Sequence, residues 1–255
     1  MFQLNQVNVR RDGRDILSLP ELTIATDKLT VILGHNGSGK STLVNILAGQ
    51  LKPDSGQVLL NNQALVHLSA RALAQQVAYL PQRLPAASGL TVAELVKLGR
   101  FPWLGTFGRF RKRDQKIMNQ AMADTDILAF KQVLADQLSG GERQRAWIAM
   151  LLAQQSPVLV LDEPTSALDV GHQYQLLALL QRLNRTTGKG VVIILHDINL
   201  ALRYADAVIA LKQGKVVFQG DHSSLLNEAQ LSDLYQANIQ LINHPTKDKK
   251  VAVVC

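Results

Sequence analysis

The chain has 255 residues, of which 47 % are apolar, so it is long enough for one large domain, alone or with an attached subdomain. Its one cysteine, Cys255, excludes an intrachain disulfide, and no run reaches the roughly 18 apolar residues of a membrane-spanning helix. The formal net charge of +7 favours an anionic partner, whether a nucleotide, a nucleic acid or a membrane surface. Because the first residues also lack the pattern of a secretion signal, we expect a soluble intracellular protein.

The first part of the chain predicts short strands joined by turns. Asp12 and Gly13 are typical of a hairpin turn, here between strands at 4–9 and 16–19. Residues 29–33 are apolar and rich in β-branched side chains, which favours a buried strand. A turn after residue 52 leads into a further strand at 57–60.

A glycine-rich loop follows the buried strand and has the phosphate-binding pattern, with a helix after it. Its glycines allow the backbone to close around phosphate oxygens, while Lys40 is expected to reach the β- and γ-phosphates and the Ser41 hydroxyl to bind Mg²⁺. The alternative, a glycine-rich turn that binds nothing, is disfavoured by the flanking strand and helix. The nucleotide-contacting residues predicted here are Gly34, His35, Asn36, Gly37, Ser38, Gly39, Lys40, Ser41 and Thr42.

The pattern changes after a strand at 77–80. Residues 84–155 are mostly helical in pattern, with a capping box formed by Thr91 and Glu94, an amphipathic stretch at 114–130 and an aromatic, glycine-rich loop at 101–110. From residue 157 an α/β pattern returns, with strands at 158–161, 191–195, 208–211 and 216–218 and helices at 174–184 and 200–204. The predicted organisation is an α/β core at 1–83 and 156–222 that includes an antiparallel β-subdomain, a helical subdomain at 84–155, a helix and strand at 223–242, and a polar tail at 243–255.

Two further clusters are able to carry chemistry. The apolar strand at 158–161 ends in Asp162 and Glu163, and next to the phosphate loop it would deliver Asp162 to Mg²⁺ and place Glu163 as a base near the γ-phosphate. Ser139 is suited to cap a helix whose start Gly140 and Gly141 leave open, which makes a second anion site. The alternatives are a solvated acidic pair and an ordinary helix cap.

Taken in order, these elements resemble the ATP-binding subunit of an ATP-binding-cassette (ABC) transporter over nearly the whole chain. The matching motifs are Walker A at 34–42, the Q-loop glutamine Gln82, the signature at 138–144, Walker B at 158–163, the D-loop at 166–169 and the switch histidine His196. The resemblance implies an α/β P-loop NTPase (RecA-like) core with an N-terminal antiparallel β-subdomain and an inserted α-helical subdomain.

The resemblance also implies a mechanism. Two copies close head to tail, and each ATP lies between Walker A of one copy and Ser139, Gly140 and Gly141 of the other. In the implied catalytic set Glu163 is the general base, His196 contacts the γ-phosphate, Gln82 senses Mg²⁺ and the attacking water, and Lys40 contacts phosphate. Mg²⁺ is assigned to Ser41, Gln82 and Asp162, and nucleotide contacts further include Glu142 and Asp169.

One position departs from the family pattern. Members usually carry an aromatic residue near the end of the first strand, and this residue stacks on adenine, whereas residues 7–12 here contain none. Either Arg10 or Arg11 stacks on the base as a planar cation, or adenine is weakly held and base selectivity is loose. We expect the second.

Local segments resemble the iron-siderophore and cobalamin uptake group, and His35 with residues 108–110 and 142–150 are similar to the ferric-hydroxamate (ferrichrome-type) importer ATPase. The resemblance implies ATP-driven uptake of a ferric siderophore through a separate integral membrane permease, with a periplasmic or lipoprotein siderophore-binding protein acting indirectly. It places the subunit peripherally on the cytoplasmic side of the inner (plasma) membrane. The alternatives are an importer of cobalamin, haem or another metal chelate, a DNA- or ribosome-acting ABC ATPase, or a small-molecule kinase; no nucleic-acid partner is expected.

Aromatic residues after the Q-loop mark a possible permease groove near Gln82 and 101–107. Phe101, Trp103, Leu104 and Phe107 are expected to be partly exposed there, the alternative being simple packing of the helical subdomain. A basic cluster nearby faces either solvent or an anionic membrane leaflet. Its members are Arg100, Arg109, Arg111, Lys112 and Arg113.

Overall fold

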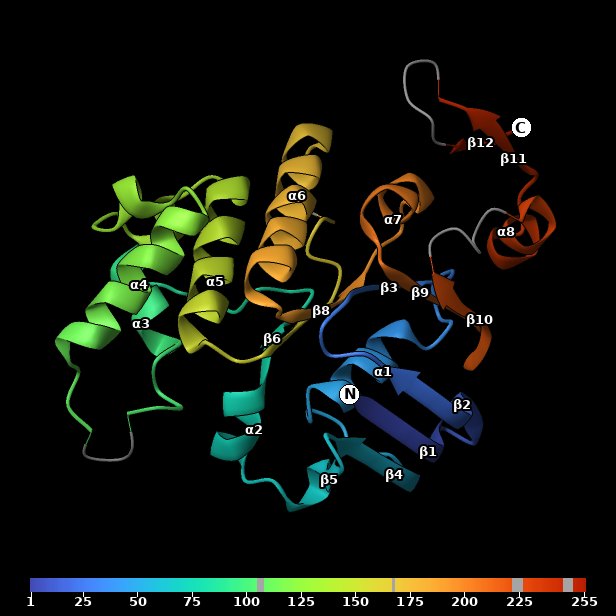
Figure 1. Ribbon diagram of the computed structural model, residues 1–255, viewed down its shortest axis with the longest axis horizontal. Helices are drawn as coiled ribbons and strands as arrows, with labels where there is room; N and C mark the ends of the chain where they lie inside the picture. The colour runs from blue at the N-terminus through green and yellow to red at the C-terminus, as the bar shows by residue number, and fades with distance from the viewer. Residues whose placement is uncertain (105–107, 167, 222–226, 245–249) are drawn as a thin grey trace. The chain divides into compact units, whose positions relative to one another are not determined.

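A computed structural model of the protein describes residues 1–104, 108–166, 168–221, 227–244 and 250–255 (Figure 1). The chain forms two compact units. The first combines Met1–His67 with Gly190–Cys255, and the second is Leu68–Lys189. No helix among the described residues is long and apolar enough to cross a membrane.

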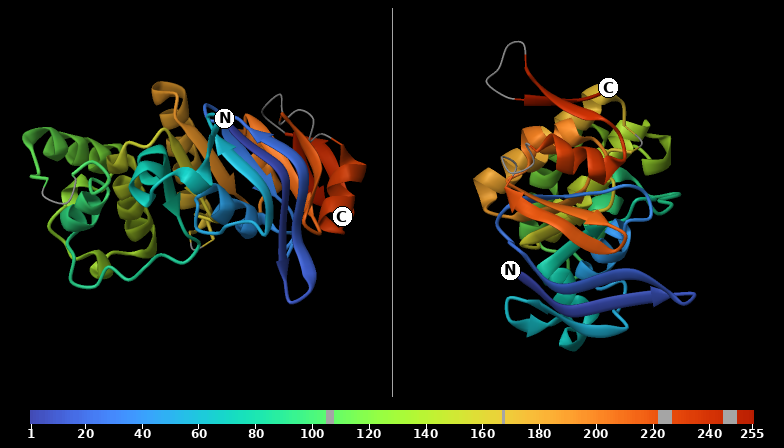
Figure 2. Two further views of the ribbon diagram at one scale, coloured as in Figure 1. Left: turned by 90° about the horizontal axis from the view of Figure 1, so that it is seen from below. Right: turned by 90° about the vertical axis from the view of Figure 1, so that its right-hand side faces the viewer.

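The first unit contains an antiparallel sheet in the order β2-β1-β4-β5. Its long hairpin, clear in Figure 2, turns at Asp12 and Gly13, which both have positive φ, as a two-residue hairpin turn requires. In β1, alternate residues are buried on either side of Gln6, whose φ of 52° shifts the pattern by one position: Phe2 and Leu4 before it, and Val7 and Val9 after it. The four strands are β1 (Phe2–Arg11), β2 (Arg14–Ile24), β4 (Ser55–Leu60) and β5 (Gln63–Ala64).

A second set of strands in this unit is centred on β3, whose five residues are all buried. This strand pairs in parallel with β8 and with β9, and β10 returns antiparallel to β9 through a turn at Gln213 and Gly214, which both have positive φ. Burial on both faces explains the continuous apolar sequence of the parallel strands. Their bounds are β3 (Leu29–Leu33), β8 (Gly190–Ile194), β9 (Ala207–Lys212) and β10 (Lys215–Asp221).

The remaining elements of the first unit include a C-terminal hairpin that the sequence did not predict. A polar tail was expected after residue 242, but Lys250–Val254 form β12, which pairs antiparallel with β11. Its valine-rich sequence favours a strand, and the polar residues before it obscured this. The other elements are α1 (Lys40–Leu47), the 3₁₀ turn η1 (Leu65–His67), α7 (Ile198–Tyr204), α8 (Glu228–Tyr235) and β11 (Ile239–Asn243).

The second unit combines two parallel strands with most of the helices. Strands β6 and β7 pair in parallel, and α3 and α4 both pack on α5, which is seen in Figure 1. The capping box of Thr91 and Glu94 is confirmed, with Glu94 N–H donating to the Thr91 hydroxyl at 3.2 Å. The elements are α2 (Ala70–Gln76), β6 (Val77–Leu80), α3 (Val92–Leu98), α4 (Lys112–Asp124), η2 (Leu128–Phe130), η3 (Ala135–Gln137), α5 (Gly140–Gln154), β7 (Val158–Leu161) and α6 (Val170–Thr187).

Two expectations for this unit are corrected. The amphipathic stretch at 114–130 is not one helix, because α4 ends at Asp124 and Asp126 has a positive φ of 54° before the short turn η2. Arg100 does not belong to an exposed basic cluster. Its side chain is 5 % exposed and pairs with Asp114 at 3.0 Å.

Candidate active site

The glycine-rich loop between β3 and α1 requires its glycines. Gly34 has a φ of 145°, and a Cβ there would collide with the Leu211 carbonyl oxygen. Gly39 is the N-cap of α1 with a φ of 100°, which is a left-handed conformation that side chains disfavour. The loop backbone therefore runs in a conformation that other residues would strain.

The interior of this loop is cationic and polar. Lys40 is 4 % exposed, and its Nζ donates to the carbonyl oxygens of Gly34 at 2.8 Å and His35 at 2.9 Å. The first turn of α1 contains no acidic residue and has no side-chain cap, and the buried Ser38 hydroxyl has no hydrogen-bond partner among the described residues. A helix N-terminus with these neighbours fits a phosphate group. Asn36, Gly37, Ser41 and Thr42 complete the loop and the first turn of α1.

In the second unit, two parallel strands end side by side at a pair of polar residues. β6 and β7 are in register, with Leu80 opposite Leu161, and Asp162 N–H donates to the Leu80 carbonyl oxygen at 2.9 Å. This register brings Gln82 to Glu163, and the amide Nε2 donates to the carboxylate Oε2 at 2.5 Å. The predicted Q-loop glutamine and the predicted base are thus in direct contact.

The backbone at Glu163 is in an uncommon conformation. Its φ of 48° lies in the left-handed region, which costs energy for a residue with a side chain. Asp162, immediately before it, is buried. Burial, together with the charge of Asp162, raises the pKa of Tyr79 on β6 to about 12.

The signature begins as predicted, with Ser139 as the N-cap of α5. The Ser139 N–H and hydroxyl both donate to Glu142 Oε2, at 2.9 and 2.7 Å, and these bonds hold the pKa of Glu142 below its ordinary value. The Glu142 carboxylate therefore serves the helix cap. A cavity of about 470 Å³ is shared by Gln82, Gly140 and Glu163, so the start of α5 and the ends of β6 and β7 face one space.

The D-loop leads into α6. Asp169 is the N-cap of this helix and accepts a hydrogen bond from the His172 N–H at 2.9 Å. The Ser166 hydroxyl donates to the Glu163 carbonyl oxygen at 3.0 Å, which ties the D-loop to the residue predicted as the base. Ala167 lies outside the described residues.

His196 lies in the first unit, in the short link between β8 and α7, where it is exposed. Asp197 caps α7 by accepting from the Asn199 and Leu200 N–H groups. The Asn199 side chain in turn bonds both backbone groups of Ala252 on β12, at 3.0 Å from its Nδ2 to the carbonyl oxygen and 2.8 Å from the Ala252 N–H to its Oδ1. The switch-histidine segment is thus linked to the C-terminal hairpin.

No cluster of three or more His, Cys, Asp or Glu side chains suited to a metal exists within the described ranges. The residues assigned to Mg²⁺, which are Ser41, Gln82 and Asp162, supply a single carboxylate. This donor set fits Mg²⁺ held mainly by nucleotide phosphates and water.

The two arginines considered for adenine stacking are engaged elsewhere. Arg10 Nε contacts Asp15 at 2.6 Å, which raises the pKa of Arg10, and Arg11 Nη1 lies 3.5 Å from Asp54. Both side chains are exposed, so these contacts are weak, but they direct the guanidinium groups toward neighbouring carboxylates.

The aromatic segment after α3 is partly exposed, as expected. Phe101 is 61 % and Trp103 42 % exposed, and Trp103 Nε1 donates to the Gln154 carbonyl oxygen at 2.6 Å. Arg71 and Gln75 both donate to the Pro102 carbonyl oxygen at 2.8 Å, so the segment is held firmly. Leu104 is half-buried, and Phe107 lies outside the described residues.

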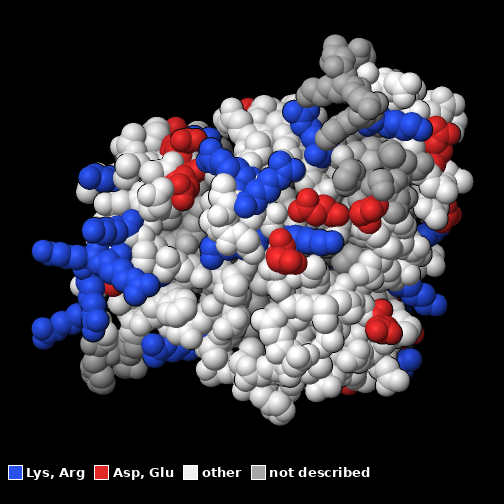
Figure 3. Space-filling view, in the orientation of Figure 1, with Lys and Arg blue, Asp and Glu red and all other residues white. Residues whose placement is uncertain are grey.

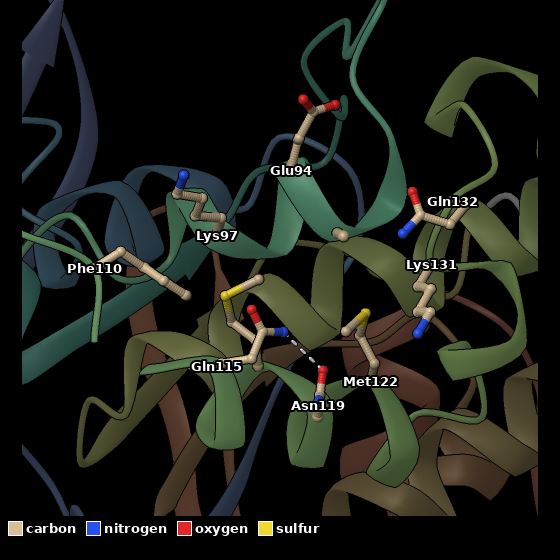
Figure 4. A pocket seen from close by; sticks show the side chains of 10 residues that line it. Glu94, Lys97, Phe110, Gln115, Asn119, Met122, Lys131 and Gln132 are labelled. Carbon is tan, nitrogen blue, oxygen red and sulfur yellow. Dashed lines mark hydrogen bonds between the residues drawn. The ribbon is translucent and has the colours of Figure 1, made fainter. Parts of the chain in front are cut away.

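A cavity and a basic surface lie close to α4 in the same unit. The cavity, of about 490 Å³, opens between α3 and α4, and Figure 4 shows Lys97, Gln115 and Met122 around it. Cationic side chains project together over α4 in Figure 3. The exposed cations at and before the first turns of this helix, which we call the basic segment, are Arg109, Arg111, Lys112, Arg113 and Lys116.

The sequence did not indicate two residues whose side chains link the predicted motifs to neighbouring segments, His172 and Asn199. His172 follows the D-loop cap by three positions, a spacing at which first-turn side chains of a helix contact the N-cap, so a signal was present. Asn199 bonds a residue 53 positions away, and no local pattern indicates that contact.

Comparisons with known proteins show the family to which the chain is similar. The ABC transporter family profile matches residues 17–166. The petrobactin import ATP-binding protein FpuD of Bacillus anthracis is 41 % identical over 224 residues, which cover 88 % of this chain and 82 % of FpuD. The iron(3+)-hydroxamate import ATP-binding protein FhuC of Bacillus subtilis (strain 168) is 37 % identical over 248 residues, which cover 97 % of this chain and 92 % of FhuC.

A solved structure supports the same assignment. The dimeric structure of MJ0796, a bacterial ABC transporter cassette, matches with a TM-score of 0.78 at 30 % identity, covering 87 % of this chain and 99 % of that one. The predicted fold class, a P-loop NTPase fold with an antiparallel β-subdomain and a helical part, is confirmed. The chain belongs to the ABC transporter family, in which it is an ATP-binding, ATP-hydrolysing cassette.

Proposed function

We propose that this ATPase powers the uptake of a ferric siderophore, of the hydroxamate class, through a separate membrane permease. The observation that carries the catalytic part is the bond of 2.5 Å between Gln82 and Glu163 at the ends of two parallel strands. This contact joins a carboxylate to an amide at positions that follow the family's order of motifs, and it supports Glu163 as the base. The transported solute is supported by the names of the relatives, which import petrobactin and iron(3+)-hydroxamate.

In the proposed mechanism two copies enclose two ATP molecules. The loop around Lys40 holds the phosphates, and Ser139, Gly140 and Gly141 of the other copy contact the γ-phosphate. Glu163 accepts a proton from the attacking water, and Gln82 and His196 orient that water and the γ-phosphate. Mg²⁺, assigned to Ser41, Gln82 and Asp162, would neutralise developing charge on the phosphate oxygens.

Glu163→Gln tests the catalytic assignment. Because the amide keeps the shape of the carboxylate but cannot accept the proton, ATP hydrolysis should fall by about 10²–10³-fold. The same variant should form a stable dimer with Mg·ATP, detected by size-exclusion chromatography with light scattering. The matched control is Glu21→Gln, an exposed carboxylate on β2, which should hydrolyse ATP normally. Unchanged hydrolysis in Glu163→Gln would refute the assignment.

The permease is proposed to dock on the second unit, at Phe101 and Trp103 and at the cavity between α3 and α4. Exposed aromatic side chains fixed by backbone contacts suit the anchor of an interface. Trp103→Ala and Phe101→Ala should abolish transport in membranes while basal ATP hydrolysis persists. Phe101→Ala is the cleaner test, because Trp103 also bonds Gln154. Normal uptake in both variants would exclude this surface.

The solute and the location are proposed from the relatives. We place the subunit peripherally on the cytoplasmic side of the membrane, bound to the permease, with a siderophore-binding protein delivering the solute from the other side. In a strain lacking its own hydroxamate importer ATPase, the chain and its permease should restore uptake of radiolabelled ferrichrome. Uptake of cobalamin or haemin instead would assign a different solute to the same ATPase.

A further inference from the structure

The imidazole of His172 lies between two motifs that are separate in sequence. Its Nδ1 is 2.8 Å from each carboxylate oxygen of Asp169, the N-cap of α6 in the D-loop. The His172 N–H bonds the same carboxylate at 2.9 Å, and the two contacts together hold the pKa of Asp169 below its ordinary value. His172 therefore holds the D-loop carboxylate through two donors, and the Gly171 N–H makes a smaller contribution.

The other side of the ring lies against the signature helix. A Cβ built on Gly141, in the first turn of α5, would be 3.5 Å from His172 Cδ2 and 3.6 Å from Cγ and Nε2. An added Cβ would thus be in ordinary van der Waals contact with the ring, so the ring lies beside Gly141 with space for about a methyl group between them. Since Nδ1 is on the opposite side of the imidazole from Cδ2 and Nε2, the ring bridges the space between Asp169 and Gly141.

The bridge is not enforced by dense packing. His172 and Gly141 also line a cavity of about 660 Å³, together with Gln144, Arg145 and Arg182. The ring is therefore free to turn into open space when its bond to Asp169 is lost. The charged groups that line the same cavity are Arg145 on α5, Arg182 on α6 and Asp126 after α4.

We propose that His172 is a positioning residue that couples the D-loop to the start of the signature helix. The inference rests on the proposed function, in which Asp169 and Ser139–Gly141 of one copy both face the other copy around ATP. Held together by His172, the two segments meet the other copy in one fixed arrangement. Without it, each must be ordered separately, and this entropy cost weakens the ATP-bound dimer.

The primary test measures the ATP concentration that gives half-maximal dimer in the Glu163→Gln background. Adding His172→Ala should raise this midpoint at least fivefold. His172→Asn retains a donor near the Nδ1 position but lacks the part of the ring on Gly141, and His172→Phe retains the ring but not the donor, so both should resemble His172→Ala. Gln175→Ala, an exposed position on the same helix, is the control and should leave the midpoint unchanged.

Steady-state kinetics of variants that keep the native Glu163 distinguish a positioning role of His172 from a general loss of folded protein. His172→Ala should raise KM for ATP at least fivefold and change kcat by less than twofold, with an unchanged melting temperature. Asp169→Ala should have little further effect in the His172→Ala background, because the two residues act through one contact. Additive effects of the two changes, or an unchanged midpoint and KM, would overturn the proposal.

Hydrogen exchange in the nucleotide-free monomer separates this proposal from the proposed function. Arg143 N–H bonds the Ser139 carbonyl oxygen at 2.8 Å, so its exchange reports the first turn of α5. Asp169→Ala should accelerate this exchange only while His172 is present. Equal acceleration with and without His172, or none at all, would refute the coupling. Failure of Glu163→Gln to dimerise would refute the proposed ATP sandwich, and the exchange result would still decide on His172.

Discussion

At the residue scale, Gln82 is in direct contact with Glu163, the proposed catalytic base. The Gln82 amide donates a hydrogen bond to the Glu163 carboxylate at 2.5 Å and adds no charge beside it. A second carboxylate in place of the amide would add a like charge, and two like charges at this distance resist ionising together.

Gln82→Glu should therefore raise the apparent pKa of the carboxyl pair by about one unit or more. A base is active only when deprotonated, so the acidic limb of the pH–rate profile of ATP hydrolysis should move to higher pH. Gln82→Ala removes the same amide without adding a charge and should lower the rate without that displacement. Identical pH profiles for the two variants would show that Gln82 and Glu163 are apart during turnover.

Tyr79, on β6, provides a test at high pH. Its pKa is raised from 10 to about 12, first by burial and then by Asp162, so the folded protein favours the neutral phenol. The stability that this contributes is fully present below pH 10 and is lost as pH rises toward 12. Tyr79→Phe should flatten the fall in the free energy of unfolding over this range. The ultraviolet difference between the two proteins should show one phenol that ionises late; a phenol ionising near pH 10 would contradict the burial argument.

At the element scale, α4 is attached to the rest of its unit by a buried ion pair. Arg100 and Asp114 side chains are 5 % and 9 % exposed, and Arg100 also donates to the Ala153 carbonyl oxygen at 2.7 Å. Burial opposes the ionisation of Asp114, but the Arg111 N–H and the Arg100 guanidinium outweigh it and hold the pKa of Asp114 below its ordinary value.

Removing one partner of this pair should cost about 3–5 kcal/mol of unfolding free energy, because the other charge is left buried. We expect this loss for Arg100→Met in urea titrations. The double variant Arg100→Met with Asp114→Leu should be more stable than Arg100→Met alone, although it also loses the cap on Arg111. A double variant that is as unstable as the sum of the two single ones would show that the charges do not interact.

The same pair shows which elements sequence reasoning is able to find. The caps of α3 and α5 were predicted because Thr91 and Ser139 bond residues three positions away. The burial of Arg100 depends on partners at 114, 153 and 155, and β12 is attached to α7 through Asn199, which is 53 positions from Ala252, so neither of these contacts has a local signature. Gln82 and Glu163 are 81 positions apart, and only the family resemblance brought them together in advance.

The C-terminal hairpin offers a second test at this scale. Asn199 on α7 bonds the Ala252 N–H and carbonyl oxygen as a neighbouring strand would, and it lies three positions after His196. Asn199→Ala should accelerate hydrogen exchange at Ala252 by about tenfold, equivalent to the roughly 1.4 kcal/mol expected for two lost bonds. Asn199→Asp keeps only the acceptor and should give an intermediate rate. Equal exchange in all three proteins would show that the hairpin does not depend on this contact.

At the scale of the whole molecule, the net charge of +7 is unevenly distributed. The basic segment places five exposed cations at and before the first turns of α4, where the positive end of the helix dipole disfavours them (Figure 3). Asp114, the acidic residue within it, is already paired with Arg100. We therefore expect the basic segment to have a function, and an anionic membrane leaflet is a matching partner for a subunit proposed to work beside a permease.

Changing Arg109, Lys112, Arg113 and Lys116 together to Gln should therefore weaken binding of the purified protein to vesicles that contain anionic phospholipid. Each lysine or arginine near such a surface contributes about 1 kcal/mol, so the loss should be large at low salt and small at high salt. The matched control changes four exposed cations elsewhere, Lys28, Lys52, Arg185 and Lys215, and has the same net charge. If both quadruple variants bind vesicles equally, total charge and not the basic segment governs the attraction, and α4 has no membrane role of its own.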